Sequence, residues 1–221
     1  MTILITGGTG ELGSKLKKIF PASISPSHTE LDICDSTLVK NFFSNNKIDS
    51  VIHSAAFTSV RGCEENQLQA FQTNVQGTKN LIDGFKNSNS SGKFVYVSTA
   101  CVFDGHSGMY TETSIPYPEN YYSLTKLLGE YIVNQLDNNL IIRTNFVGRT
   151  KWPYQKAFTD RFGTYLFSEQ VAQGIFDVYN DNMEGIVHIV GNKKISMYEL
   201  AKLTTPEIQP MTMNDYVGPR L

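Results

Sequence analysis

A glycine-rich loop directly after the first apolar run places the strongest constraint on the fold of this chain. The run Ile3–Thr6 leads into "TGGTGELG", in which Gly7, Gly10 and Gly13 recur at every third position. This is a variant of the dinucleotide fingerprint, where the chain turns sharply out of a strand and brings backbone amides close to a pyrophosphate at a helix N-terminus. A tight turn alone also favours glycine. The order of strand, glycine loop and helix nevertheless matches what the motif requires, and it predicts a nucleotide-binding site.

Short apolar runs alternate with helix-period segments along the rest of the chain. The strongest strands are expected at Ile3–Thr6, Val51–Ser54, Phe94–Ser98 and Leu140–Arg143, with weaker ones at Ala22–Ser25 and Ile186–Val190. Helices are expected at Glu11–Ile19, Asp35–Ser44, Glu64–Phe85, Tyr121–Leu136 and Glu169–Tyr179. Almost continuous apolar runs are typical of strands buried on both faces, as in a parallel sheet. The alternation predicts an α/β fold with a doubly wound parallel sheet, the Rossmann fold, and right-handed crossovers.

Three further stretches are short or irregular. In "SMYE", Ser196 and Glu199 have the spacing of a capping box and predict one more helix. The polar run "NSNSSG" at Asn87–Gly92 is typical of a connecting loop. The residues from Ile208 onward show no clear pattern, and we expect them to be poorly ordered.

Charge and cysteine content restrict the class of function. The formal charge of −2 provides no basic field, so neither nucleic acid nor a membrane is expected as a partner. No apolar run reaches the roughly 18 residues of a membrane span, and "MTILIT" lacks the charged start of a signal peptide. Cys34, Cys63 and Cys101 are odd in number and widely spaced, which matches neither a disulfide framework nor a zinc site. The composition predicts a reduced, cytoplasmic protein without a metal.

The choice between NAD and NADP depends on the end of the second expected strand. An acidic residue at that point binds the ribose 2′-hydroxyl and disfavours a 2′-phosphate. The stretch "SISPSH" contains none, and Glu30 and Asp32 come slightly later. The sequence therefore favours NADP slightly, while NAD stays open.

The hexapeptide "YYSLTK" contains a candidate proton donor. Tyr122 and Lys126 are four residues apart and share one face of a helix, whereas Tyr121 points about 100° away. A phenol titrates near 10, and we expect a nearby ammonium, and a nicotinamide cation when oxidised cofactor is bound, to lower that value. Tyr122 would then be a general acid for an alkoxide that forms at a carbonyl carbon. The spacing also occurs often by chance, and an exposed aromatic beside a solvated lysine is the simpler interpretation of the hexapeptide alone.

Two other segments favour the catalytic interpretation. The stretch "VSTACVFDG" follows a strand and places Ser98 and Thr99 at the carboxyl end of the sheet, where open α/β folds bind ligands. A hydroxyl there can form a hydrogen bond with a substrate oxygen. The stretch "TNVQGT" places Asn74 inside a helical segment, where a buried amide needs a polar partner.

Six motifs in order give the chain a resemblance to a known family. They are "TGGTGELG", "VIHSAAFTSV", "NVQGTKNL", "VYVSTACVFDG", "YYSLTKLLGE" and "IIRTNFVG". As a set they resemble the extended short-chain dehydrogenase/reductases, and most of all the dTDP-4-dehydrorhamnose reductase branch. The resemblance covers roughly residues 1–149, with a fainter match at "GTYLFSEQVAQGI" and "ISMYELAKL".

The resemblance implies a role for individual residues. Thr99 would be the hydroxyl partner of a catalytic trio, Tyr122 the proton donor, and Lys126 the residue that binds the nicotinamide ribose and tunes the tyrosine. Ten residues would contact the cofactor: along the pyrophosphate Gly7, Gly10, Glu11, Leu12 and Gly13, beside the adenine Asp32 and Ile33, and further along the cofactor Ala55, Ala56 and Lys126. The implied reaction is hydride delivery from NAD(P)H to the C4 keto group of a nucleotide-linked deoxysugar, in nucleotide-sugar metabolism such as dTDP-rhamnose biosynthesis.

The chain departs from the pattern of this family in several places. Arg61 stands where the family has an acid, and Phe146 where it has a tryptophan. The interval 150–166 is shorter than in relatives, and the chain ends where they continue. We therefore expect a Rossmann domain at residues 1–149. Residues 150–221 would be a mixed region that completes the sheet and forms a small, reduced substrate-binding part.

Two alternatives to a reductase stay open. The regulatory subunit of methionine adenosyltransferase resembles the same branch, so the chain could be a non-catalytic NADP-binding subunit. A sugar-nucleotide epimerase of the same superfamily would retain its cofactor and show no net NADPH consumption. The intact set of Thr99, Tyr122 and Lys126 favours the reductase. The expected partner is a nucleotide-sugar substrate, and a homodimer is compatible with this prediction.

Overall fold

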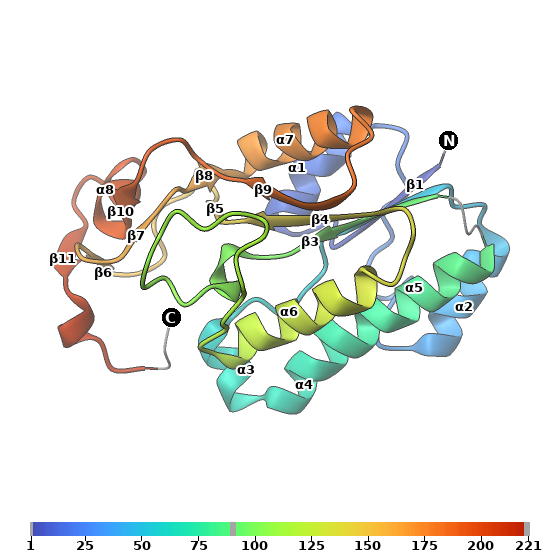
Figure 1. Ribbon diagram of the computed structural model, residues 1–221, viewed down its shortest axis with the longest axis horizontal. Helices are drawn as coiled ribbons and strands as arrows, with labels where there is room; N and C mark the ends of the chain where they lie inside the picture. The colour runs from blue at the N-terminus through green and yellow to red at the C-terminus, as the bar shows by residue number, and fades with distance from the viewer. Residues whose placement is uncertain (1, 89–91, 219–221) are drawn as a thin grey trace.

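A five-stranded parallel sheet forms the centre of the molecule (Figure 1). The structure is a computed structural model that describes residues 2–88 and 92–218. Neighbouring strands follow the order β1 (Ile3–Thr6), β2 (Ser50–His53), β3 (Lys93–Val97), β4 (Asn139–Thr144) and β9 (Gly185–Ile189), and each adjacent pair is parallel. The strands predicted from the apolar runs are confirmed to within one residue.

The weak strand expected at Ala22–Ser25 is reduced to a single bridge. Ile24 pairs in parallel with Leu4, and its backbone exchanges hydrogen bonds with Ile3 and Ile5, each 2.8 Å long. Pro26 follows closely and has no N–H with which to extend a ladder. This segment lies on one side of β1 while β2 lies on the other, so the chain reverses its direction of winding at β1.

Helices cover both faces of the sheet, as a doubly wound fold requires (Figure 1). Helices α1 (Glu11–Ile19) and α7 (Ser168–Asn180) pack together on one face. Helices α2 (Ser36–Asn45), α5 (Gly77–Ser88) and α6 (Tyr121–Val133) pack side by side on the other. The predicted α/β fold is confirmed.

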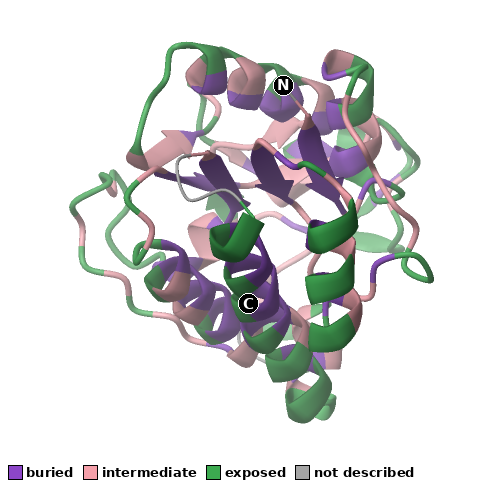
Figure 2. Cartoon of the chain, turned by 90° about the vertical axis from the view of Figure 1, so that its right-hand side faces the viewer, coloured by how far each residue is buried: buried purple, intermediate pink, exposed green. Residues whose placement is uncertain are grey.

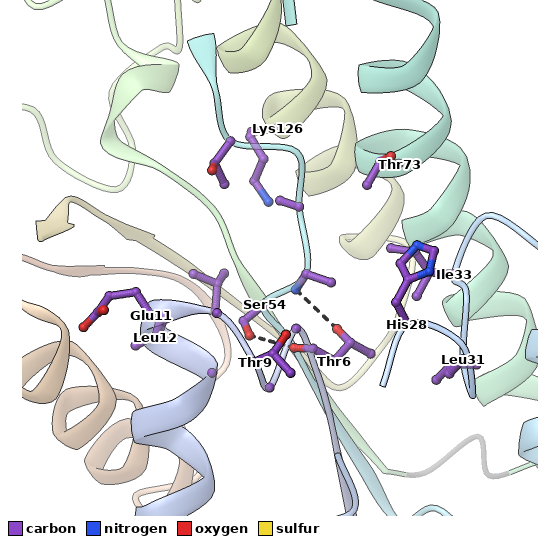
Figure 3. Close-up of a pocket in the computed structure, with 18 of the residues that line it drawn as sticks. Thr6, Thr9, Glu11, Leu12, His28, Leu31, Ile33, Ser54, Thr73 and Lys126 are labelled. Atoms are coloured by element: carbon purple, nitrogen blue, oxygen red, sulfur yellow. Dashed lines mark hydrogen bonds between the residues drawn. The ribbon is translucent and has the colours of Figure 1, made fainter. Parts of the chain in front are cut away.

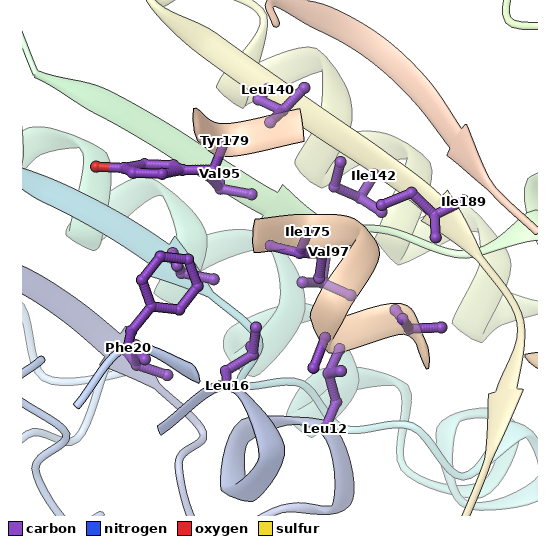
Figure 4. Close-up of a cluster of buried hydrophobic side chains, with 14 of the residues drawn as sticks. Leu12, Leu16, Phe20, Val95, Val97, Leu140, Ile142, Ile175, Tyr179 and Ile189 are labelled. Atoms are coloured by element: carbon purple, nitrogen blue, oxygen red, sulfur yellow. The ribbon is translucent and has the colours of Figure 1, made fainter. Parts of the chain in front are cut away.

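Alternate residues of the strands contribute to two separate cores; β1 to β4 are buried throughout, and β9 is mostly of intermediate burial (Figure 2). Toward α1 and α7, Leu16 and Ile175 meet sheet residues such as Val95 and Ile142 (Figure 4). Toward α2, α5 and α6, the same strands turn Tyr96 and others inward. Burial on both faces explains why the strands lack period-2 alternation in the sequence.

The prediction of one continuous helix at Glu64–Phe85 is wrong, because the segment is divided into several shorter helices. The chain forms α3 (Val60–Glu65), α4 (Gln67–Phe71), the π-helix η1 (Gln72–Gln76) and then α5. Asn66, with φ −132° and ψ 60°, breaks the first junction. In the π turn the buried Asn74 accepts from Phe57 N at 2.8 Å and donates to Phe57 O and to Thr125 Oγ1, at 3.0 and 2.9 Å. The prediction that a buried Asn74 needs polar partners is confirmed.

Side-chain caps set several of the helix boundaries. Asp35 caps α2 from outside by accepting from Thr37 N and Leu38 N, and Asn120 caps α6 by accepting from Ser123 N. The predicted capping box of Ser196 is confirmed and begins α8 (Met197–Lys202). Helix α6 ends at Val133, before the expected end at Leu136. Helix α5 extends to Ser88, so the loop expected at Asn87–Gly92 starts later, and its residues 89–91 lie outside the described residues.

The C-terminal part adds small strand pairs at the end of the sheet to which β4 runs (Figure 1). These are β5 (Phe146–Val147) with β8 (Leu166–Phe167), β6 (Lys156–Phe158) with β11 (Gln209–Met211), and β7 (Phe162–Gly163) with β10 (Ile195–Ser196). Two short 3₁₀ turns, η2 (Ala100–Val102) and η3 (Met213–Asp215), complete the elements. The expectation of poor order from Ile208 onward is wrong as far as Asp215, because β11 pairs with β6 over more than fifty residues of sequence. No helix of the described residues combines the length and hydropathy needed to cross a membrane.

Candidate functional site

A cavity of about 450 Å³ lies at the carboxyl ends of β1, β2 and β3 (Figure 3). Its wall is formed by the glycine loop, the segment 26–34 that follows the bridge at Ile24, the turn after β2, and the first turns of α6. All ten residues implied as cofactor contacts line it: Gly7, Gly10, Glu11, Leu12, Gly13, Asp32, Ile33, Ala55, Ala56 and Lys126. The position at the point where the winding reverses is the one at which open α/β folds bind their ligands.

The glycine loop is packed so closely that side chains would not fit. Gly7 has φ +73°, and a Cβ there would lie 2.7 Å from the backbone nitrogen of Ala55. A Cβ on Gly13 would lie 2.1 Å from the carbonyl oxygen of Gly7. Helix α1 begins after Gly10 without a side-chain cap, so its first amides remain for a ligand. A pyrophosphate fits this cradle in shape and in polarity.

Substitution of Gly7 tests the cradle directly. Gly7→Ala and Gly105→Ala both force an L-residue into the left-handed region, at φ +73° and +75°, which costs about 1–2 kcal/mol. Only at position 7 does the new methyl group meet backbone, because nothing lies within 4 Å at Gly105. We expect both variants to lose stability, Gly7→Ala more because its methyl group meets backbone, and NADPH binding to weaken by about tenfold or more in Gly7→Ala alone. Calorimetric titration measures the affinity, and equal affinities in the two variants would contradict the cradle.

At the opposite end of the cavity from Glu11 and Leu12 lie His28, Leu31 and Ile33 (Figure 3). The carboxylate of Asp32 contacts two neighbouring residues. Its Oδ1 accepts a hydrogen bond from Cys34 N at 2.9 Å and lies 3.6 Å from Nε2 of His28. The carboxylate therefore fixes the loop that forms this end.

Sequence reasoning missed two polar residues, Ser54 in the wall of the cavity and Ser25 behind the glycine loop. Ser54 Oγ donates to Thr6 O at 2.7 Å and ties the end of β2 to the start of the glycine loop (Figure 3). Ser25 Oγ is buried beside Gly8 and has no hydrogen-bonding partner within the described part of the chain. Of these two residues, Ser25 lies in the stretch "SISPSH" that bears on the choice of cofactor, directly before Pro26.

Tyr122 and Lys126 line the same cavity as the glycine loop, and Tyr121 does not. Asn120 fixes the start of α6, which turns positions 122 and 126 toward the cavity. Thr99 is buried and does not line the cavity, but its side chain forms a hydrogen bond with Tyr122. Its Oγ1 also accepts from Cys101 N at 3.1 Å, which begins η2. The structure thus brings the three residues together; their roles stay a prediction.

The expectation that Lys126 lowers the pKa of Tyr122 is wrong for this structure. Burial raises the pKa of Tyr122 above its ordinary value, and the hydrogen bond from Thr99 offsets part of that rise. Burial also lowers the pKa of Lys126 to about 7, while the nearby carboxylate of Glu130 raises it. Loss of water has the largest effect on the pKa of both groups.

Ser98 has a different partner from the expected one. Its Oγ donates to Oε1 of Glu130 at 2.5 Å, although the residue also lines the cavity. Glu130 in turn forms a buried salt bridge with Arg143, 2.7 Å from Oε2 to Nη2. Glu130 lies four residues after Lys126 on α6, and its carboxylate raises the pKa of that lysine. Sequence reasoning did not find this buried polar group.

Replacing Lys126 by methionine tests the pH dependence of folding stability. The pKa of Lys126 is about 7 in the folded protein, whereas the ordinary value for a lysine, which applies to the unfolded chain, is 10.5. Between these values the unfolded chain binds more protons than the folded one. The free energy of unfolding of the wild type should therefore rise with pH from about 7 upward relative to Lys126→Met, by up to about 1.4 kcal/mol per pH unit. Denaturant titrations between pH 7 and pH 9 measure it; a constant difference between the two proteins would contradict the buried amine.

Comparison with known proteins supplies a family and several relatives. The family model described as "RmlD substrate binding domain" matches residues 1–217. A dTDP-4-dehydrorhamnose reductase of Aggregatibacter actinomycetemcomitans is 30% identical over 227 residues, covering 90% of this chain and 76% of the relative. The methionine adenosyltransferase 2 subunit beta of Rattus norvegicus is 28% identical over 261 residues, covering 98% and 77%.

The fold also matches a solved structure. It is the dTDP-4-dehydrorhamnose reductase of Bacillus anthracis in complex with NADP, with a TM-score of 0.89 and 23% identity. The alignment covers 100% of this chain and 87% of that one. At this identity the match shows a shared fold.

Proposed function

Because the chain belongs to the RmlD substrate-binding domain family, we propose that it is an NADPH-dependent reductase of the keto group of a nucleotide-linked deoxysugar. One observation carries the proposal: Tyr122 and Lys126 line the cavity whose opposite wall is the glycine loop. A proton donor and a dinucleotide cradle that share one cavity suit carbonyl reduction.

Residues of this chain would hold NADP at three places. The loop Gly7–Gly13 would take the pyrophosphate, Asp32 and Ile33 would flank the adenine, and Lys126 would bind the nicotinamide ribose. The absence of an acid in the stretch 22–28 and the NADP in the Bacillus anthracis structure support NADP, with NAD as the alternative. When bound, the nicotinamide supplies the hydride.

The side chains of the trio would supply and place the proton. The raised pKa of Tyr122 keeps its phenol protonated at neutral pH, so it can donate to an oxygen that becomes an alkoxide. The hydrogen bond from Thr99 to Tyr122 would orient the phenol and stabilise the phenolate left behind. Lys126, on the same face of α6 one turn later, would add positive charge when protonated.

The division into two parts is also a proposal. We propose that residues 1–149 form the cofactor domain, and that within residues 150–221, α7 and β9 complete it. The remaining short strand pairs and α8 would form a reduced substrate side. Their place at the carboxyl end of β4 supports this assignment (Figure 1).

A non-catalytic subunit is the second candidate, because 98% of this chain aligns with the methionine adenosyltransferase subunit. A screen of 4-keto sugar nucleotides with NADPH and NADH, followed at the cofactor absorbance, separates the candidates. Consumption of NADPH supports the reductase. Conversion of a sugar nucleotide without net consumption supports an epimerase. No turnover, together with a stable complex with a methionine adenosyltransferase catalytic subunit, supports the second candidate.

A further inference from the structure

The side chain of Lys126 is buried at the wall of the cavity. Lys126 is 3% exposed, and among the described residues no carboxylate or carbonyl oxygen accepts a hydrogen bond from its Nζ. The Nζ lies instead over the ring of Tyr96, 4.1 Å from the ring centroid. Figure 3 shows the amine pointing into the cavity. One side of the amine therefore faces the ligand space, and another faces an aromatic ring.

The nearest carboxylate, Glu130, is already engaged. Its Oε1 accepts from Ser98 Oγ at 2.5 Å and from Arg143 Nε at 3.1 Å, and its Oε2 accepts from Arg143 Nη2 at 2.7 Å. Glu130 still raises the pKa of Lys126. Because Ser98 and Arg143 occupy both of its oxygens, this carboxylate acts on Lys126 through its charge and not through a hydrogen bond.

The other titratable groups that face the amine are neutral near pH 7. His53, on β2, lies between Thr6 Oγ1 at 2.7 Å and Thr78 Oγ1 at 3.0 Å, and burial lowers its pKa to about 3. Tyr122, one turn earlier on α6, keeps its proton because its pKa is raised. The ring of Tyr96 is thus the direct contact that can stabilise a positive charge on Lys126.

The ring of Tyr96 is fixed in place beneath the amine. Tyr96 is fully buried on β3, and its phenol donates to the backbone oxygen of Lys126 at 3.3 Å. Gly129 makes room for it, since a Cβ there would lie 2.2 Å from the phenolic oxygen. The ring also contacts His53, with centroids 5.6 Å apart. A fixed ring gives the cation a fixed position.

We propose that Tyr96 is a positioning residue, whose ring face holds the Nζ of Lys126 as an ammonium at the wall of the cavity. This inference rests on the proposed function, in which that ammonium binds the nicotinamide ribose and faces Tyr122. A cation over an aromatic face is attracted by the ring quadrupole, and most strongly where water is excluded. The attraction opposes the burial that favours the neutral amine, and so keeps a large fraction of Lys126 charged at neutral pH.

Graded removal of electron density from the ring tests this role at nearly constant shape. The variants are Tyr96→Phe, which keeps the ring face and removes the hydroxyl, and the protein with 3,4,5-trifluorophenylalanine at position 96. The titration of Lys126 is followed by NMR of protein labelled with ¹³C at the lysine ε carbons, and its signal is identified by its loss in Lys126→Met. The affinity for NADP⁺ is measured over the same pH range.

We expect Tyr96→Phe to titrate close to the wild type. The trifluorinated protein should titrate about one pH unit lower, and its NADP⁺ affinity should fall at a correspondingly lower pH. A merely structural role for the ring would change stability but leave both midpoints in place, and equal midpoints in the two variants would overturn the proposal. If the midpoints follow fluorination but no sugar nucleotide is reduced, the inference stands and the proposed reductase fails.

Discussion

Tyr122→Phe is expected to lower the turnover number by about 10²–10⁴-fold, the range typical of a lost general acid. Tyr122 lines the cavity, and the substitution removes only its phenolic oxygen, which forms a hydrogen bond with Thr99. The ring that packs in the wall is kept, so the fold and the affinity for NADPH should change little. Steady-state rates of NADPH oxidation with a 4-keto sugar nucleotide measure the effect.

The matched control is Tyr121→Phe. Tyr121 is the preceding residue of the same helix turn, but it does not line the cavity. Its backbone N–H, which the substitution keeps, donates to Glu64. Turnover should therefore stay close to that of the wild type. Wild-type turnover in Tyr122→Phe, or an equal loss in both variants, would refute the assignment of Tyr122 as the acid.

Arg143→Met is expected to lower the free energy of unfolding by about 3–5 kcal/mol. Arg143 and Glu130 form a salt bridge in which the side chains are 3% and 5% exposed. Removing the guanidinium leaves the carboxylate of Glu130 buried. Of its two side-chain donors, Arg143 and Ser98, only Ser98 then remains. An uncompensated buried charge is far more costly than a lost pair. Urea denaturation at neutral pH measures the loss.

Two variants make this result specific. The double variant Glu130→Gln with Arg143→Met removes both charges and should recover much of the lost stability. Lys79→Ala breaks an exposed pair with Asp83 and should cost less than about 1 kcal/mol. If Arg143→Met lowers the free energy of unfolding no more than Lys79→Ala does, the buried pair does not stabilise the fold as proposed.

The sequence predicts the central layer of the fold well for a physical reason. Strands such as β1 and β4 are buried on both faces, so their apolar runs are continuous and easily distinguished from the helices between them. The glycine loop is equally clear, because its conformation and close contacts exclude a Cβ at Gly7 and Gly13. Such constraints act on residues that are close together in the sequence, so the sequence alone reveals them.

Features that depend on contacts between residues far apart in the sequence could not be predicted from it. The strand β11 forms only against β6, and the π turn at Asn74 depends on hydrogen bonds with the backbone of Phe57. The group of Ser98, Glu130 and Arg143 joins three elements. Their spacing in the sequence carries no signal that they meet.

The candidate site shows the same limit in its electrostatics. Spacing alone places Tyr122 and Lys126 on one face of a helix, and the structure confirms that they share a cavity. The direction of the tyrosine pKa was nevertheless predicted wrongly. Helical spacing gives the distance between two charges, but it does not show how much water each group loses on folding.

The most direct test of the proposed reductase is the transfer of deuterium from cofactor to sugar. The protein is incubated with NADPH carrying two deuterium atoms at C4 of the nicotinamide and with a 4-keto sugar nucleotide, and the product is examined by NMR and mass spectrometry. We predict one deuterium on the former keto carbon of the sugar, with one NADPH consumed for each product molecule, and far slower transfer in Tyr122→Phe. A sugar nucleotide that returns without deuterium while NADPH remains intact, across the panel of 4-keto substrates, would contradict it.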